Sequence, residues 1–177
     1  MNIQELQTLL TKIPKLPEAQ LRDLYVALEQ HEHASKREQA AKYFMRFVSK
    51  VWPNFIEGSH HKKMAAAFEK VAKGKLKRLI INMPPRHTKS EFASYLLPAW
   101  FLGKYPHKKV IQTSHTAELA VNFGRKVRNL VDQASYSEVF PDVALQADSK
   151  AAGRWATNAG GEYFAIGVGG AVTGKGA

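Results

Sequence analysis

The pattern of apolar and polar positions divides the chain into a helical first part and an alternating α/β second part. Pro17 suits the first turn of a helix. Apolar side chains then recur at helical spacing until Pro53 ends the pattern. These positions are Leu21, Leu24, Tyr25, Leu28, Phe44, Phe47, Val48 and Val51. A further helix is predicted over residues 60–73, with Gly74 at its C-terminal end.

From residue 78 onward, short apolar runs alternate with helical stripes. Residues 78–83 predict a strand, and the helix after it buries Phe92, Tyr95, Leu96 and Ala99. Residues 110–114 predict a second strand. The helix over 116–131 then turns Leu119, Phe123, Val127 and Leu130 inward. Residues 154–158 and 162–168 predict a hairpin joined across Gly160 and Gly161. This order favours an α/β fold with a parallel sheet flanked by helices.

The connection between the first predicted strand and its helix carries the candidate chemistry. It reads Pro84-Pro85-Arg86-His87-Thr88-Lys89-Ser90-Glu91. A phosphate-binding loop needs a Lys for the β- and γ-phosphates and a Ser or Thr hydroxyl for Mg²⁺, and Lys89 and Ser90 supply both. The strict pattern G-x-x-x-x-G-K-[ST] has glycines at the positions of Met83 and Thr88. A plain turn between a strand and a helix also fits these residues.

The string from Met83 to Glu91 resembles the variant Walker A motif of large terminase subunits, the ATP-driven DNA-packaging motors of tailed bacteriophages. Three further stretches resemble the same family in the same order, at residues 114–128, 154–161 and 167–177. The resemblance covers roughly residues 41–177.

The resemblance implies a P-loop NTPase fold that binds ATP and Mg²⁺. It implies that Lys89 contacts the transferred phosphates, that Ser90 binds Mg²⁺, and that Arg86 senses or stabilises the γ-phosphate. His60 or His61 lies near the place where related motors read the adenine ring. Lys175 stands where the family carries an arginine that reaches a neighbouring subunit's ATP. The implied site comprises His61, Pro85, Arg86, His87, Thr88, Lys89, Ser90 and Lys175.

Under this resemblance, residues 1–40 are an N-terminal helical appendage that docks on the portal protein or the small terminase subunit. Residues 41–177 are a partial ATPase domain that ends before the Walker B acids, without the family's nuclease domain. We therefore expect the complete protein to be an ATP hydrolase in a homo-oligomeric ring that moves double-stranded DNA. The 177-residue chain alone is expected to be inactive.

The charge of the chain fits either a polyanion partner or an ordinary solvated basic surface. The net charge is +11, and residues 1–35 hold three basic and five acidic side chains. The other 142 residues therefore hold 23 basic and ten acidic side chains. Under the terminase resemblance, this excess implies phosphate contacts to DNA without base reading. A non-enzymatic basic nucleic-acid-binding module and another P-loop motor such as a helicase remain the alternatives.

The remaining features of the sequence limit the choice of compartment and cofactor. No cysteine is present, so thiolate metal sites and disulfides are excluded. No apolar stretch approaches the ~20 residues that span a bilayer. We expect the protein to be located in the host cytoplasm. His31 and His33 lie on different faces of their helix, so no metal site is predicted there.

Overall fold

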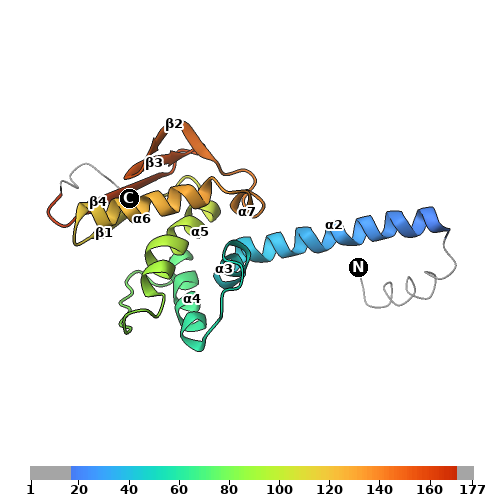
Figure 1. Cartoon of the computed structure of the whole chain (residues 1–177), viewed down its shortest axis with the longest axis horizontal. Helices are drawn as coiled ribbons and strands as arrows, with labels where there is room; N and C mark the ends of the chain where they lie inside the picture. The colour runs from blue at the N-terminus through green and yellow to red at the C-terminus, as the bar shows by residue number, and fades with distance from the viewer. Residues whose placement is uncertain (1–16, 171–177) are drawn as a thin grey trace. The chain divides into compact units, whose positions relative to one another are not determined.

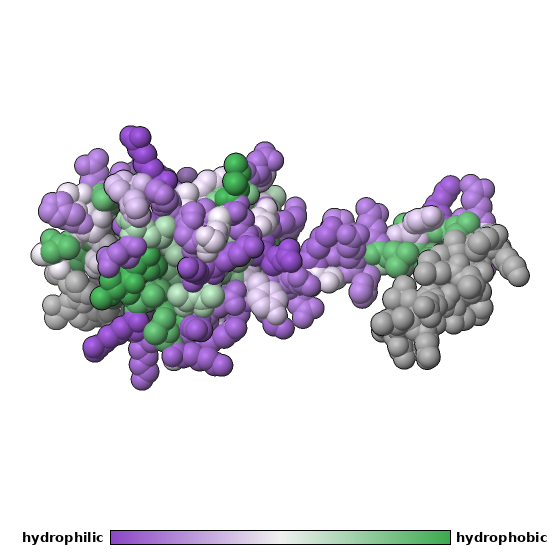
Figure 2. Space-filling view, turned by 90° about the horizontal axis from the view of Figure 1, so that it is seen from below, coloured by the Kyte–Doolittle hydropathy of each residue, from purple (hydrophilic) through white to green (hydrophobic). Residues whose placement is uncertain are grey.

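The computed structural model describes residues 17–170 (Figure 1). The chain divides between Arg37 and Glu38 into two compact units, and helix α2 (Glu18–Lys42) runs across this boundary. Within the first unit, α2 exposes Tyr25, Val26 and Leu28. Hydrophobic patches coloured green are visible among the polar side chains in Figure 2. The predicted boundary at residue 40 between appendage and ATPase domain stays a prediction.

The second unit opens with two helices that the apolar spacing predicted. They are α3 (Phe44–Val51) and α4 (Ser59–Ala72). After α4 the chain turns at Gly74, whose φ is 70°. The Gly74 N–H bonds to the Val71 carbonyl, and the Lys75 N–H bonds to the Lys70 carbonyl. This is the Schellman ending, which satisfies the last carbonyls of the helix and confirms Gly74 as its stop.

The strand predicted over residues 78–83 is wrong, because this segment pairs with no strand among the described residues. Its apolar side chains are divided between solvent and core. Ile80 is 85% exposed, whereas Ile81 and Met83 pack against the core. Alternate side chains therefore anchor the segment that leads into the loop, without a hydrogen-bonded ladder.

After the loop, a helix begins at Lys89 and widens into the π-helix η2 (Glu91–Leu96). It continues as α5 (Leu97–Lys104). The Leu97 N–H bonds to the Phe92 carbonyl, five residues back. Pro98 follows directly and has no N–H to give to a preceding carbonyl. The wide turn thus lies where a proline interrupts the regular hydrogen-bond ladder.

A four-stranded sheet packs beside the helices of the second unit. Its strands are β1 (Lys109–Ser114), β2 (Leu145–Ala151), β3 (Arg154–Thr157) and β4 (Glu162–Gly167), in the order β1-β4-β3-β2. Among the strands of residues 17–170, only β1 and β4 pair in parallel. The α/β class is therefore confirmed and the hairpin of β3 and β4 is present. The expected parallel sheet is corrected to a mixed one, because β3 pairs antiparallel with both β4 and β2.

Helix α6 (Ala117–Val131) runs along this sheet (Figure 1) and packs on β4 and β1. Thr116 caps it by accepting the Leu119 N–H at 3.2 Å. The predicted inward stripe is only partly right, since Leu119 is 44% exposed and Phe123 is half-buried. The buried face is Ala120, Gly124, Val127, Leu130 and Val131. A Cβ on Gly124 would lie 2.5 Å from the Ala152 carbonyl oxygen, so close backbone approach at Gly124 sets the rotation of α6.

Aromatic rings join the helices of the second unit. Phe44 makes edge contacts with Phe68, Phe92 and Trp100 at centroid distances of 5.3 to 5.6 Å. The short helix α7 (Ala134–Ser137) adds Tyr136 to this core. None of the helices described in residues 17–170 is long and apolar enough to cross a membrane.

Candidate phosphate loop

Two residues of the loop hold a left-handed backbone. Arg86 has a φ of 62° and Thr88 a φ of 57°. For an L-residue this conformation costs about 1–2 kcal/mol, and for a β-branched residue it is rare. Thr88 stands where the strict motif has glycine, so the backbone takes the turn that glycine would favour.

Side chains of the loop bond to the loop's own carbonyls. The His87 Nδ1–H donates to the Pro85 carbonyl at 2.9 Å, and the Thr88 hydroxyl donates to the His87 carbonyl at 2.7 Å. The Phe92 N–H bonds to the Thr88 carbonyl at 2.9 Å and begins the following helix. The carbonyls of Pro85, His87 and Thr88 are thereby fixed.

His61 reaches the loop from the first turn of α4. Its ring is 5% exposed, and its Nε2 lies 2.6 Å from Thr88 Oγ1. Its Nδ1 accepts the Gly58 N–H at 2.9 Å. The rings of Phe55 and Phe92 lie 4.7 and 4.9 Å from the imidazole, centroid to centroid. Both ring nitrogens therefore have partners, and two aromatic rings pack against the imidazole.

Burial lowers the pKa of His61, because it penalises the charged imidazolium. The neighbouring His60 lowers this pKa further, Glu57 opposes the shift, and His87 adds to it. The ring centroids of His60 and His61 are 3.8 Å apart. Neutral imidazole is accordingly the favoured form of His61.

The side chains that are expected to bind phosphate differ from His61 in exposure and in hydrogen bonding. Arg86 and Ser90 are exposed and Lys89 is half-buried. Within residues 17–170, these three side chains make no hydrogen bond or ion pair to the protein. Lys89 and Ser90 begin a helix, whose N-terminal amides and dipole favour an anion.

The structure thus brings together seven of the residues that the sequence singled out. They are His61, Pro85, Arg86, His87, Thr88, Lys89 and Ser90. Lys175 lies outside the described residues. Both candidates for adenine reading contact the loop, since the His60 ring lies 5.8 Å from the His87 ring and His61 bonds to Thr88. For His61 to read an adenine, one of its nitrogens would have to leave its present partner. Gly58 was missed, although its place three residues before His61 is the spacing of a capping box.

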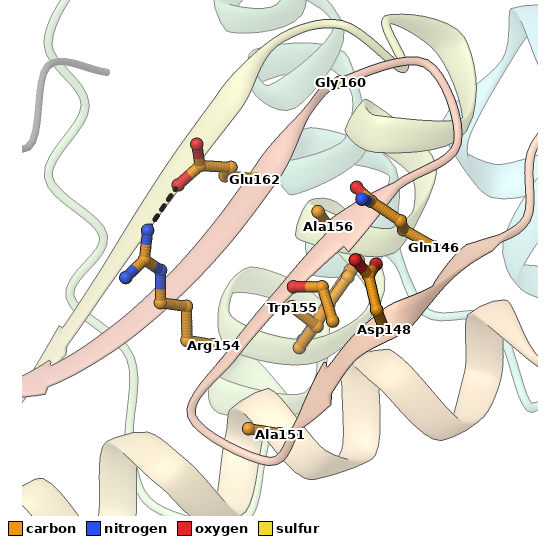
Figure 3. Close-up of a pocket in the computed structure, with 9 residues that line it drawn as sticks. Gln146, Asp148, Ala151, Arg154, Trp155, Ala156, Gly160 and Glu162 are labelled. Atoms are coloured by element: carbon orange, nitrogen blue, oxygen red, sulfur yellow. Dashed lines mark ion pairs between the residues drawn. The ribbon is translucent and has the colours of Figure 1, made fainter.

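A separate cavity of about 590 Å³ opens on strands β2, β3 and β4 (Figure 3). Gln146, Asp148, Arg154 and Glu162 are among its lining residues, and an Arg154 nitrogen lies 3.5 Å from a Glu162 carboxylate oxygen. It contains none of the predicted site residues. Sequence reasoning missed it because the polar strand β2 has no apolar alternation to predict it.

Among the described residues, no group of three or more His, Cys, Asp or Glu side chains is placed to hold a metal ion. Comparisons with protein-family models, curated proteins and solved structures found no match to this chain.

Proposed function

We propose that this chain binds ATP through the loop at residues 84–90 and belongs to an ATP-driven DNA-packaging motor of the large-terminase kind. One observation carries the nucleotide site. The side chains of Arg86, Lys89 and Ser90 make no hydrogen bond or ion pair to residues 17–170. The neighbouring side chains of His87 and Thr88, by contrast, donate hydrogen bonds to carbonyls of the loop. Residues that shape a turn and residues available to a ligand are thus distinct.

The chemistry of these side chains suits a nucleoside triphosphate. A lysine at a helix N-terminus adds a cation to amides that already attract phosphate. Arg86 offers a planar fork for the γ-phosphate, and Ser90 offers an oxygen to the Mg²⁺ that ATP carries. The carbonyls of Pro85 and His87 accept hydrogen bonds from loop side chains, which reduces their repulsion of an anion.

Calorimetric titration of the full chain with ATP and Mg²⁺ tests the site. Lys89→Ala should weaken binding at least tenfold, because a charge-assisted phosphate contact is lost. Lys63→Ala is the matched control, since Lys63 is an exposed lysine on α4. Equal affinities for wild type and Lys89→Ala would refute the phosphate-loop assignment.

A DNA-packaging motor also requires macromolecular partners. We propose double-stranded DNA, held through its phosphates, together with a portal protein, a small terminase subunit and a ring of identical chains in the host cytoplasm. Lys175 is proposed to act in trans within such a ring. Adding Lys175→Ala subunits to Lys89→Ala subunits of the complete motor tests this, because partial recovery of hydrolysis requires a shared site.

The second candidate function is a nucleic-acid-binding module that does not hydrolyse ATP. A run of exposed basic side chains favours it. Five basic side chains follow closely from the end of α4 towards the loop, and all are exposed. They are Lys70, Lys73, Lys75, Lys77 and Arg78, which we call the basic segment. DNA binding by the basic segment without nucleotide binding at Lys89 would favour this candidate over the motor.

A further inference from the structure

We propose that His61 is a positioning residue, which holds the phosphate loop in its turned conformation by binding the Thr88 hydroxyl. The inference rests on the proposed nucleotide site for its consequence. The contact itself, 2.6 Å from His61 Nε2 to Thr88 Oγ1, does not depend on that proposal.

The hydrogen-bond partners fix the direction of every proton in this contact. The Gly58 N–H can only donate, so His61 Nδ1 accepts and carries no proton. In the neutral ring the proton therefore lies on Nε2 and is donated to Thr88 Oγ1. The Thr88 hydroxyl in turn gives its own proton to the His87 carbonyl. The bonds run in one direction from Gly58 to the loop, with each donor and acceptor used once.

The contact with His61 holds a strained part of the loop backbone in place. Thr88 holds a left-handed backbone that its β-branched side chain disfavours, and such strain persists only where the surroundings impose it. His61 is rigid enough to impose it, because Phe55, Phe92 and His60 all contact its ring. Since Thr88 directly precedes Lys89, its backbone decides where the lysine and the first helical amides point.

Only neutral His61 can make both bonds. Protonation would place an N–H on Nδ1 opposite the Gly58 N–H, and two donors would face each other. The ionisable groups around the ring are His60, Glu57 and His87. Acid therefore breaks the bond from Gly58 that orients the ring, while the Nε2–H remains a donor to Thr88.

Nitrogen-15 spectra of the imidazoles of the full chain at pH 7.5 test the contact without a nucleotide. The expected result is the Nε2–H form for His61, with an Nε2 proton that exchanges slowly with water. Thr88→Val keeps the shape of the side chain and removes the hydroxyl, so it should make this proton exchange rapidly, whereas Thr88→Ser should not. An Nδ1–H form, or an Nε2 proton unaffected by Thr88→Val, would overturn the proposal.

Two substitutions of His61 separate its two bonds. Gln places an amide nitrogen near the position of Nε2, and Asn places an amide oxygen near that of Nδ1. We expect His61→Asn and Thr88→Val to weaken ATP·Mg²⁺ binding by roughly three- to tenfold, with His61→Gln within about twofold of wild type. Wild-type affinity in His61→Asn would contradict positioning by His61. If wild type binds no nucleotide, the proposed function fails, and the imidazole spectra still decide whether His61 holds Thr88.

Discussion

At the scale of single residues, side chains in this loop replace what glycine usually supplies. Glycine reaches a left-handed backbone without steric cost, whereas Thr88 does so with a hydroxyl that is bonded on both sides. The sequence pattern predicted a phosphate loop at these residues and marked Thr88 as the departure from it. It did not predict the contact with His61, because the two residues lie 27 positions apart and only the packing of α4 brings them together.

Acid should destabilise the protein through His61. Its pKa is lowered in the folded chain, so the unfolded chain takes up the proton first, below the ordinary value of about 6.5. The stabilisation from His61 is thus complete above that pH and is lost as the pH falls towards the folded pKa. Urea unfolding at pH 7.5, 6.5 and 5.5 should show the advantage of wild type over His61→Gln shrinking with acidity. A constant difference would contradict this assignment.

Two buried tyrosines should respond in opposite ways to loss of the hydroxyl. The Tyr136 hydroxyl donates to the Ala99 carbonyl at 2.9 Å, while the buried Tyr163 hydroxyl has no partner among the described residues. Burial raises the pKa of both. Tyr136→Phe should therefore cost about 1 kcal/mol and Tyr163→Phe should stabilise by about 1 kcal/mol. Urea unfolding of the two variants tests this, and destabilisation by Tyr163→Phe would reveal a partner.

At the scale of helices and strands, elements with local signals were predictable and those that depend on distant partners were not. The end of α4 was predicted because Gly74 marks a helix stop by itself. The hairpin was predicted from apolar runs on either side of Gly160 and Gly161. Residues 78–83 have the composition of a strand, yet strand formation also requires a neighbour, which no local pattern reveals. The π-helix before Pro98 was equally invisible to an apolar stripe.

Packing of α6 on the sheet gives a prediction at this scale. Alanine is the better helix former by about 1 kcal/mol, but a Cβ on Gly124 would lie 2.5 Å from the Ala152 carbonyl oxygen and 3.1 Å from a Tyr163 ring carbon. Gly124→Ala should therefore destabilise by about 1–3 kcal/mol. Asn122→Ala, at an exposed position of α6, is the control and should be neutral or stabilising. Thermal unfolding measures both, and a stabilised Gly124→Ala would show that α6 does not press on the sheet.

At the scale of the whole molecule, charge is the property that extends beyond any one site. The excess of basic side chains is concentrated after residue 35. The exposed basic segment continues directly into residues 78–83 and then into the loop. A polyanion on the basic segment would thus lie close along the chain to the proposed nucleotide site.

DNA binding should weaken with salt in proportion to the phosphates that the protein neutralises. The triple change Lys75→Gln, Lys77→Gln and Arg78→Gln should make the slope of log K against log salt shallower by up to about 3, since each contact contributes roughly 0.9. Arg22→Gln, Lys36→Gln and Arg37→Gln on α2 remove the same charge elsewhere and form the control. Fluorescence anisotropy with a short duplex measures the slopes. Equal slopes for the two triple variants would place the DNA contacts outside the basic segment.

The rings packed around His61 also determine which tryptophan can report on the loop. Trp100 and Trp155 are fully buried, and their indole N–H groups donate to the Ala40 and Gly124 carbonyls. Trp52 is half-buried and lies 5.0 Å from Phe55, the ring that touches His61. Of the three indoles, Trp52 is therefore the natural fluorophore for events at residues 84–90, with the other two as a constant background. A Trp52→Phe chain would be optically silent towards loop movement, so the native protein can be followed in stopped-flow experiments without any attached dye.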